Sequence, residues 1–477
     1  MKAKQNIIIL ISIETYLRNW IEAGAFIALG KNYNIHYVLA EYDWNPEDIQ
    51  KYGIEKYHIV SQRKYRKMLF RRLLSVTMFR HAKTSHAFRI KINLAKPGFR
   101  FMYHFLALPI IYDCLLWTID KFLPRWNEFS DLVQEINPVL VLAPSLCADS
   151  FTIDMTYTAK KDGIKSMLLI NSWDNLVSKG VIPIAPDCLI VWGQQGINQA
   201  VNIQKIPGNK VVQLGVPRFE AYFHPQKTCF SPSIHEFNQI PENKKIILYA
   251  TTSLPFDDVS VLEQLDKMIS VNHRFTDYVI LFRPHPEMMK RIDEKNINQF
   301  HFDNVYLDQQ VANFYSSRFG MHDDDYKSQI NNSDLDYYPM LLKSISGMIC
   351  PPTTLSLEGA INGVPCLMIC YGDGKNTYLP PDLVSQYENV QEILNFPGMI
   401  PCYQESFLSE CFEKLIEFSN TENIRNKLSK ASNYVVYRDE NSYDKRLLLV
   451  VNNLLNGNPL RLEPSSQAAN ESSTPVK

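Results

Sequence analysis

Short runs of apolar residues alternate along most of the chain with segments that have helical periodicity. Continuous apolar runs of this kind are typical of strands buried on both faces of a parallel sheet. Strands that alternate with helices predict an α/β fold in which helices flank each sheet. The predicted strands are Asn6–Ile13, Ile35–Ala40, Val139–Ala143, Ser166–Ile170, Cys188–Trp192, Lys245–Ala250, Tyr278–Phe282, Gly347–Cys350 and Pro365–Ile369.

A polar stretch interrupts this alternation near the middle of the chain. It contains Pro225, Pro232 and Pro241, and this composition is typical of a linker between domains. A chain of 477 residues also exceeds what one hydrophobic core usually organises. We therefore expect two Rossmann-like, doubly wound domains of similar size.

The predicted boundaries follow from the linker and from the composition of the last residues. Residues from about 456 onwards are rich in Ser, Asn and Pro and have no apolar period, which predicts a disordered tail. Just before them, Ser442–Leu455 has the pattern of an amphipathic helix, which either closes the second domain or packs back against the first. The expected organisation is a first domain at 1–222, a linker at 223–243, a second domain at 244–455 and a tail at 456–477.

Composition and cysteine usage narrow the class of protein. The chain is 45% hydrophobic and 21% charged, with a formal net charge of -1, so nothing global predicts nucleic acid as a partner. Its nine cysteines include no CxxC pair, which favours reduced, buried thiols. The apolar start is followed by Glu14 and Arg18 without a small-residue cleavage site, so we expect a first buried strand and a cytoplasmic protein.

The longest apolar stretch, Phe101–Leu123, is interrupted by His104, Pro109, Asp113 and Asp120. A membrane-spanning helix needs about 18 or more clean apolar residues. We therefore expect a core or interface helix there.

Residues 61–100 form a local charge asymmetry. They contain about twelve Lys or Arg residues and no Asp or Glu. Large apolar residues are interleaved at helical spacing, which favours a helix lying on an anionic membrane surface or meeting a lipid-linked acceptor at the inner face of the membrane. A solvated basic helix and an RNA-binding patch are the alternatives. The apolar residues are Met68, Leu69, Phe70, Leu73, Leu74, Met78 and Phe79.

The first candidate for chemistry is the sequence RPHP that follows the predicted strand Tyr278–Phe282. Ligands of open α/β sheets bind at the carboxyl ends of strands, and a proline on each side of His285 limits the freedom of the backbone. Arg283 and His285 suit phosphate oxygens, and His285 is also a candidate catalytic acid for a leaving phosphate. An ordinary strand-end turn with an exposed histidine is the alternative.

The second candidate, Ser346–Ile369, reads as strand, turn, helix, glycine-containing turn and strand. Thr353, Thr354 and Ser356 lie where the helix should begin, and helix N-termini bind anions through free amide groups and the helix dipole. Glu358 is placed to accept hydrogen bonds from ribose hydroxyls. The alternative is a capping box with Thr354 or Leu355 at the cap and Glu358 assisting.

Together the two segments resemble a pair of motifs from one group of transferases. They are similar to the HP motif and the Ser/Thr motif of bacterial GT-B sialyltransferases, polysialyltransferases, capsule Kdo transferases and the CDP-glycerol glycerophosphotransferase family. The resemblance implies that His285, Thr353 and Thr354 hold the phosphate and ribose of a CMP- or CDP-linked donor. The chain has Thr-Thr where several of these families have paired serines, which leaves the donor open.

The same stretch, TTLSLEGAINGVP, is also similar to the donor-site helix of UDP-sugar GT-B enzymes, including UDP-N-acetylglucosamine 2-epimerase. That resemblance implies Glu358 on the ribose. The GT-B resemblance as a whole implies two Rossmann-like domains facing a cleft, a nucleotide-sugar as substrate, and neither a cofactor nor a metal. The cluster His322–Asp325 is a weak alternative for a cation, since further ligands are missing from its surroundings in the sequence.

Acceptor-side candidates follow two predicted strands of the first domain. The segment NSWDNLVSKG resembles one in uncharacterised surface-polysaccharide glycosyltransferases, and there Trp173 could stack on a sugar ring while Asp174 and Asn175 orient it. The alternative is a loop in which Asp174 caps a turn. Lys179 suits phosphate.

After the first strand, Arg18 and Asn19 are expected to position the acceptor, and Glu14 is a candidate base for the acceptor hydroxyl. Asp174 is the other candidate base, and a helix N-terminal charge is the alternative for Glu14.

These features predict a metal-independent glycosyltransferase that moves a sugar from a nucleotide-sugar donor to a surface-glycan or lipid-linked acceptor. Three alternatives stay open. They are a CDP-polyol phosphotransferase, a nucleotide-sugar epimerase, and a scaffold that binds glycan or nucleotide without turnover.

Overall fold

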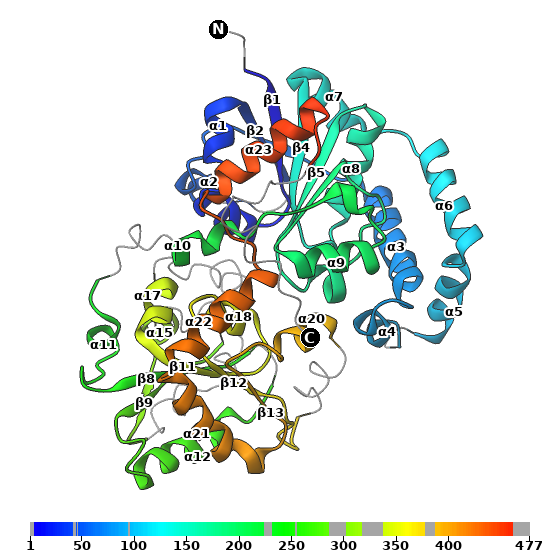
Figure 1. Ribbon diagram of the computed structural model, residues 1–477. Helices are drawn as coiled ribbons and strands as arrows, with labels where there is room; N and C mark the ends of the chain where they lie inside the picture. Colours follow the sequence, from blue (N-terminus) through cyan, green and yellow to red (C-terminus); the bar gives the residue numbers. More distant parts are fainter. Residues whose placement is uncertain are drawn as a thin grey trace. The chain divides into compact units, whose positions relative to one another are not determined.

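The structure is a computed structural model that describes residues 4–41, 44, 46–93, 96–223, 231–252, 255–285, 302–316, 337–376 and 387–460. The chain forms two compact units (Figure 1). Unit 1 comprises the residues up to Glu220 together with those from Tyr434 onwards, and unit 2 comprises Ala221–Asn433.

Unit 1 is built on a sheet in which the seven described strands are all parallel. The strand order is β3-β2-β1-β4-β5-β6-β7, so the chain reverses its direction of winding between β1 and β4. The strands are β1 (Asn6–Ile11), β2 (Asn34–Ala40), β3 (Tyr57–Val60), β4 (Pro138–Ser145), β5 (Lys165–Ile170), β6 (Cys188–Val191) and β7 (Val211–Gln213).

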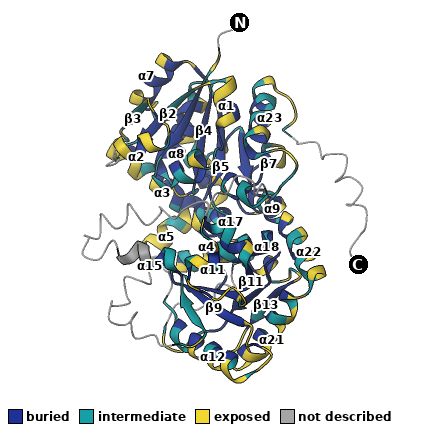
Figure 2. Cartoon of the chain, turned by 90° about the vertical axis from the view of Figure 1, so that its left-hand side faces the viewer, coloured by how far each residue is buried: buried dark blue, intermediate teal, exposed yellow. Residues whose placement is uncertain are grey.

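Hydrophobic clusters cover both faces of this sheet. Along β1, Ile7 and Ile9 belong to one cluster and Ile8 and Leu10 to another. Both faces of the sheet are buried against apolar side chains, which explains the uninterrupted apolar run in the sequence. The central strands are accordingly buried in Figure 2.

The helices of unit 1 flank the sheet and extend beyond it. They are α1 (Ile27–Asn32), α2 (Pro46–Lys51), α3 (Lys64–His81), α4 (His86–Asn93), α5 (Pro97–Leu106), α6 (Pro109–Phe122), α7 (Asn127–Ile136), α8 (Ser150–Lys161), α9 (Gln194–Asn202) and α23 (Tyr443–Asn456), with α10 (Glu220–Phe223) at the boundary. Two π-helical segments, Leu17–Glu22 and Asn175–Lys179, follow β1 and β5.

Unit 2 repeats the architecture with six described parallel strands in the order β10-β9-β8-β11-β12-β13. Here the winding reverses between β8 and β11. The strands are β8 (Lys245–Ala250), β9 (Tyr278–Arg283), β10 (Val305–Leu307), β11 (Ile345–Cys350), β12 (Cys366–Ile369) and β13 (Met399–Cys402). The helices are α11 (Ile234–Phe237), α12 (Asp258–Val271), α15 (Gln309–Ser316), α17 (Tyr337–Ser344), α18 (Thr354–Ile361), α20 (Glu388–Ile393), α21 (Leu408–Ser419) and α22 (Glu422–Ala431).

All nine predicted strands are present, and the prediction of two doubly wound parallel sheets is confirmed. The strands that the sequence did not reveal are β3, β7, β10 and β13, which are the outermost strands of the two sheets. β7 and β10 have three residues each, and β3 and β10 are mainly half-buried. An edge strand therefore lacks the continuous apolar run on which the prediction relied.

The end of the described chain belongs to unit 1, whereas the sequence analysis assigned residues up to 455 to the second domain. Apolar residues of α23, including Tyr443, Leu447 and Val450, lie in the core cluster that contains β1. Arg446 adds ion pairs to Glu220 at 2.9 Å and Asp439 at 3.1 Å. Of the two alternatives for this amphipathic helix, the structure selects packing against the first domain. Of the predicted linker 223–243, residues 224–230 lie outside the described residues, and the described remainder belongs to unit 2, where Ile234 and Ile240 are buried. Of the predicted tail 456–477, residues from 461 lie outside the described residues.

The basic segment 61–100 includes helix α3, whose apolar side faces inward. Phe70, Leu73, Leu74 and Phe79 are all buried in one cluster with residues of α8. These four side chains therefore contact protein, which corrects the prediction that they face a lipid surface, whereas Met68 of the same helix is 52% exposed. The exposed side of α3 carries cations: Lys64, Lys67, Arg71 and Arg72.

Among the described residues, no single helix is long and apolar enough to cross a membrane. Helices α5 and α6 pass the test of length and composition only as a pair, and their axes are bent by 81° at the break between them.

Candidate functional site

The carboxyl ends of β8 and β11 form the switch point of the second sheet, where the winding reverses. In open α/β sheets this is where ligands bind. β8 leads directly to Thr251, the neighbouring β9 ends in Arg283 and leads to His285, and β11 leads through a short turn to Thr353. The RPHP segment and the Thr353–Glu358 segment therefore lie at one edge of one sheet, as predicted from their places after successive strands.

Arg283 is buried, and protein groups occupy its guanidinium. Nη1 lies 2.5 Å from the carboxylate of Asp308, and Nη2 donates to Gln310 at 2.8 Å and to the hydroxyl of Tyr338 at 3.0 Å. The guanidinium also lies 4.6 Å from the centre of the Tyr338 ring. Burial alone would lower the pKa of Arg283, but the charge of Asp308 raises it above the usual value. These contacts fit a residue that fixes the loop after β9 better than the phosphate-binding fork that the sequence suggested.

His285 is half-buried, and its backbone position is fixed by the neighbouring strand. Its N–H donates to Oγ1 of Thr251 at 2.7 Å, while the N–H of Thr251 donates to the carbonyl of Arg283 at 3.2 Å. The two hydrogen bonds tie the RPHP loop to the end of β8. His285 is thereby held beside the switch point, and Pro286 and the residues after it lie outside the described part of the chain.

Thr353 is the N-cap residue of α18, and its side chain makes no capping hydrogen bond. Ser356 is buried and donates from Oγ to the carbonyl of Thr353 at 2.6 Å. Thr353 and Thr354 are half-buried at the helix start, where amide groups and the helix dipole favour an anion.

The predicted alternative for this helix, a capping box, does not form. With Thr353 at the N-cap, Glu358 lies two residues beyond the third helical position that such a motif needs, and it accepts a hydrogen bond from the hydroxyl of Tyr222. The half-buried carboxylate is therefore held by a side chain from α10, within unit 2.

In unit 1, the loops after β1 and β5 meet through Asn171. Oδ1 of Asn171 accepts from the indole of Trp20 at 3.0 Å and from Nδ2 of Asn19 at 3.3 Å. Glu14 and Arg18 are half-buried in the first of these loops. The structure thus brings together the two acceptor-side segments that the sequence singled out separately. Asn19 is buried and bound to Asn171, so it positions a loop and has little surface for an acceptor.

The loop after β5 holds the remaining acceptor-side candidates. Trp173 and Asn175 are buried, and Oδ1 of Asn175 accepts the N–H of Ser172 at 2.7 Å. Their burial supports a role in shaping the loop in place of the expected direct contact with a sugar. Asp174 is half-buried and lies 3.5 Å from Nζ of Lys179. Asp174 is therefore the more accessible group of this loop and keeps its place as a candidate base.

Three residues that the sequence analysis did not assign complete these two edges. Thr251 binds the RPHP loop, Asn171 joins the two loops of unit 1, and Tyr222 holds Glu358. A signal existed for Thr251, because it opens a Thr-Thr-Ser run directly after the first strand of the second unit. Asn171 and Tyr222 have no such signal, since their partners are 136 to 152 residues away in the sequence.

The candidate cation cluster His322–Asp325 lies outside the described residues. Within the described parts of the chain, no group of three or more His, Cys, Asp or Glu residues could hold a metal ion.

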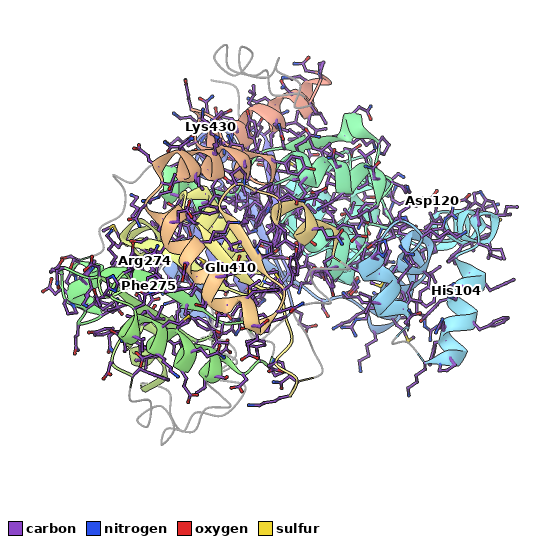
Figure 3. All side chains as sticks on the ribbon, turned by 60° about the horizontal axis from the view of Figure 1, so that its bottom comes forward. His104, Asp120, Arg274, Phe275, Glu410 and Lys430 are labelled. Carbon is purple, nitrogen blue, oxygen red and sulfur yellow. The ribbon has the colours of Figure 1, made fainter. Side chains whose placement is uncertain are left out.

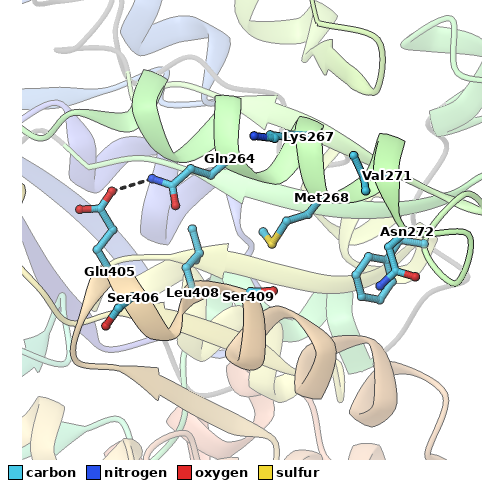
Figure 4. Close-up of a pocket in the computed structure, with 10 residues that line it drawn as sticks. Gln264, Lys267, Met268, Val271, Asn272, Glu405, Ser406, Leu408 and Ser409 are labelled. Atoms are coloured by element: carbon cyan, nitrogen blue, oxygen red, sulfur yellow. Dashed lines mark hydrogen bonds between the residues drawn. The ribbon is translucent and has the colours of Figure 1, made fainter.

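An open groove of about 430 Å³ lies between α12 and the start of α21, bounded by Gln264, Met268 and Leu408 (Figure 4). Gln264 donates to Glu405 across it at 2.6 Å. None of the predicted donor-site residues lines this groove, so it is separate from the switch point of the sheet.

The fold defines the chain as a GT-B protein, which confirms the expected fold class. The chain is similar to a putative UDP-N-acetylglucosamine 2-epimerase from Listeria monocytogenes, with 9% identity, a TM-score of 0.55, and coverage of 96% of this chain and 100% of that one. It is similar to MnaA of S. aureus in complex with UDP, with 11% identity, a TM-score of 0.52, and coverage of 95% and 97%. The calicheamicin glycosyltransferase CalG4 is 10% identical with a TM-score of 0.50, and the two chains are covered to 96% and 99%.

At the level of sequence, a family model of CDP-glycerol:poly(glycerophosphate) glycerophosphotransferases matches residues 194–315. This segment begins in unit 1 at α9, crosses into unit 2 and includes the RPHP loop, but it ends before Thr353. The match confirms the resemblance to this transferase family that the RPHP loop suggested. No curated protein matches the chain by sequence.

Proposed function

We propose that this protein is a metal-independent glycosyltransferase that uses a nucleotide-sugar donor and a surface-glycan or lipid-linked acceptor. The observation that carries the proposal is the convergence of His285, Thr251 and the start of α18 at the switch point of the second sheet. Each contributes a group that suits phosphate: an imidazole, a hydroxyl, and amides at a helix N-terminus. The transferase-family match over residues 194–315 supports the same class.

On the donor side, the diphosphate would lie against the N-terminus of α18, with His285 beside it. Stabilising negative charge on the leaving phosphate is the main electrostatic task in such a transfer. Glu358, oriented by Tyr222, would accept hydrogen bonds from the ribose hydroxyls. Arg283 would act as a positioning residue, because its guanidinium is bound to Asp308 and its strand leads directly to His285.

On the acceptor side, a carboxylate of unit 1 would take the proton of the attacking hydroxyl. The hydroxyl oxygen then forms the bond to the anomeric carbon while the bond to the donor phosphate breaks, and the nucleotide leaves with the electron pair. Glu14 and Asp174 are the candidate bases, both half-buried at the carboxyl edge of the first sheet. Lys179, whose Nζ lies 3.5 Å from the Asp174 carboxylate, limits the orientations that this carboxylate can adopt.

A second candidate function, transfer of a polyol phosphate from a CDP carrier, is favoured by the family-model match. Its donor would use the same phosphate-binding groups, but the phosphorus atom next to the polyol would be attacked in place of an anomeric carbon. The fold is also similar to that of proteins described as UDP-N-acetylglucosamine 2-epimerases. Only the identity of the bound nucleotide and product separates these activities.

The test is a thermal-shift and calorimetric series with CMP, CDP, UDP and GDP, followed by CDP-glycerol and common nucleotide-sugars. A ligand that binds the folded state raises its apparent stability. A nucleotide-sugar that stabilises the protein and donates to a glycan acceptor supports the main proposal, whereas turnover of CDP-glycerol alone supports the second. Epimerised product without acceptor would exclude both, and binding without turnover of any donor would indicate a scaffold.

Two N-cap threonines provide a matched pair of variants for the donor site. Thr353→Ala should weaken nucleotide binding about tenfold or more, because the lost hydroxyl contacts charged phosphate. Thr421→Ala alters the N-cap of α22, whose side chain also makes no capping bond, at the opposite end of the sheet near Lys245. Equal affinity in the two variants would contradict the donor site at α18.

We also propose that the protein works in the cytoplasm, at the inner face of the membrane. The described cysteines are all free, including Cys350 and Cys366, whose sulfur atoms lie 3.5 Å apart without a bond. Free thiols so close together suit a reducing compartment.

A further inference from the structure

Helices α5 and α6 carry an unusual concentration of exposed apolar side chains. Eight of the seventeen large hydrophobic residues that are exposed in the described chain lie between residues 99 and 122. No residue of α5 is buried. Figure 3 shows side chains of these helices, including the labelled His104 and Asp120, pointing away from the ribbon. The eight are Phe99 (55% exposed), Phe101 (78%), Met102 (41%), Phe105 (53%), Leu108 (49%), Ile110 (79%), Trp117 (58%) and Phe122 (65%).

These exposed residues sit on helices that are firmly attached to unit 1 by their other side. The hydroxyls of Tyr112 and Thr77 lie 2.7 Å apart, which joins α6 to α3. Tyr157 of α8 donates to the carbonyl of Leu123 at 2.8 Å, and the rings of Phe79 and Tyr103 lie 5.4 Å apart. The apolar surface is therefore presented outward on a fixed support. A contiguous exposed patch of this kind marks an interaction surface.

The charged residues that flank the apolar surface of α5 and α6 indicate what kind of partner it binds. The segment from 61 to 100, which leads into α5, contains no acidic residue, and exposed Lys96 and Arg100 flank its first turn. At the far end, Lys121 lies with its Nζ 4.7 Å from the centre of the Trp117 ring. Aromatic residues combined with flanking cations are the composition of segments that lie at the interface of an anionic bilayer. Helix α6 also carries exposed Asp113 and Asp120, and Asp120 lies 3.3 Å from Nζ of Lys161, so the excess of positive charge comes from residues 61–100. A second copy of the chain would bring two such cationic segments together.

We infer that α5 and α6 form a bent helical elbow that docks on an anionic membrane surface, with both helices lying in the interface. The 81° bend between them excludes a straight span by this pair and suits two helices that follow a surface. The exposed cations of α3 (Lys64, Lys67, Arg71 and Arg72) add attraction to anionic headgroups. The inference refines the proposed location at the membrane and is independent of the donor, whose binding residues lie in unit 2.

The experiment is co-sedimentation of the full chain with vesicles of phosphatidylcholine alone or with a third phosphatidylglycerol. Wild type should bind the anionic vesicles, and binding should weaken as salt rises, because electrostatic attraction to headgroups is screened. The triple variant Phe101→Ser, Ile110→Ser and Trp117→Ser should lose at least tenfold in apparent affinity. The control Ile59→Ser, Val271→Ser and Leu449→Ser removes three exposed apolar residues elsewhere (53%, 78% and 48% exposed) and should bind like wild type.

Trp117 provides a second measurement, which reports where the bound protein contacts the lipid. It is 58% exposed, whereas Trp20, Trp126, Trp173 and Trp192 are buried and Trp44 is half-buried. Lipids brominated near the headgroup should therefore quench the emission of wild type on anionic vesicles and not that of Trp117→Phe.

Three results would overturn the inference. They are absence of binding to anionic vesicles, equal loss of binding in the control triple variant, and lipid-free dimers of wild type that the Phe101, Ile110 and Trp117 variant abolishes. Nucleotide-induced thermal shifts, measured in parallel, report on the donor site separately.

Discussion

The carboxyl edges of the two sheets share one topology but differ in how their side chains are bound. In unit 1, polar side chains of two loops are joined to each other, since Asn171 accepts from both Asn19 and Trp20. In unit 2, the loops at the switch point are held through backbone groups: Thr251 accepts the N–H of His285, and Ser356 donates to the carbonyl of Thr353. A loop held through its backbone can direct its side chains at a ligand.

This difference indicates which edge binds the charged substrate. Both edges lie where open α/β sheets bind ligands, so topology alone does not distinguish them. The second edge combines hydroxyls, an imidazole and a helix N-terminus, which suit phosphate, while the first offers the half-buried carboxylates of Glu14 and Asp174, which suit a neutral hydroxyl-bearing molecule. In the proposed function, the same fold would supply a donor edge and an acceptor edge through the residues that follow corresponding strands.

The largest effect is expected at Arg283. It distinguishes a structural role of this side chain at the second edge from direct contact with a bound phosphate. Arg283→Ala should destabilise unit 2 by about 3–5 kcal/mol, because it leaves Asp308 buried without its partner. Chemical denaturation measures this loss. Arg66→Ala is the control in unit 1, where it breaks the buried pair with Asp154 at 2.5 Å; it should destabilise similarly without changing nucleotide affinity. An Arg283 variant of normal stability that no longer binds nucleotide would show a direct phosphate contact.

The next effect sharpens the description of the acceptor edge. Asn171→Ala should cost about 1–3 kcal/mol in the free energy of unfolding, because the indole N–H of Trp20 and the amide of Asn19 lose a buried acceptor. Nucleotide affinity should stay unchanged, since the donor groups lie in unit 2. Urea denaturation and nucleotide titration check the two parts, with exposed Asn202→Ala as the control. Loss of nucleotide binding in Asn171→Ala would contradict the assignment of nucleotide binding to the second edge alone.

At the second edge, a pH effect on stability is expected from Asp258. Burial raises the pKa of Asp258, at the start of α12, to about 7, and Tyr249 donates to this carboxyl at 2.8 Å. A raised native pKa stabilises the fold below the unfolded-state value and loses that contribution as pH rises through the native value. Stability should therefore fall between about pH 4 and 7, by up to about 1.4 kcal/mol per pH unit. Asp258→Asn should remove this component from urea denaturation curves recorded across the range, and an unchanged slope would contradict it.

The smallest effect concerns the bond that holds the RPHP loop. Thr251→Val removes the acceptor of the His285 N–H and should cost about 1 kcal/mol of stability. Nucleotide affinity should fall severalfold, because the loop would no longer be held beside the switch point. Thr251→Ser retains the hydroxyl and should restore both properties. Failure of the serine variant to do so would mean that the methyl group, not the hydrogen bond, matters.

The sequence predicted the central strands and the edge at which the motifs meet, because both depend on local pattern. Strands buried on both faces have a continuous apolar run, and the residues after them must lie at the carboxyl edge. It missed the outer strands β3, β7, β10 and β13, where one side is open and the run is short.

Local pattern also failed wherever a side chain is bound by a distant partner. The position of Arg283 at a strand end could be predicted, but Asp308, which occupies its guanidinium, comes after a further strand. Likewise the basic character of α3 was visible, while its burial depends on Tyr157 of α8 and its neighbours in the same cluster. In both cases the sequence predicted the chemical type of the residues correctly but not the side chains that contact them.

The placement of α23 within unit 1 has a consequence for synthesis on the ribosome. The cluster beside β1 needs Tyr443, Leu447, Val450 and Val451, which are made only after all of unit 2. Unit 2 is continuous in the chain and can fold as it emerges, whereas unit 1 must wait with part of one face of its sheet uncovered. Unit 2 can therefore complete its folding before unit 1, although most of unit 1 is translated first. Until α23 is made, the partly uncovered sheet of unit 1 is the part of the nascent chain that most needs a chaperone.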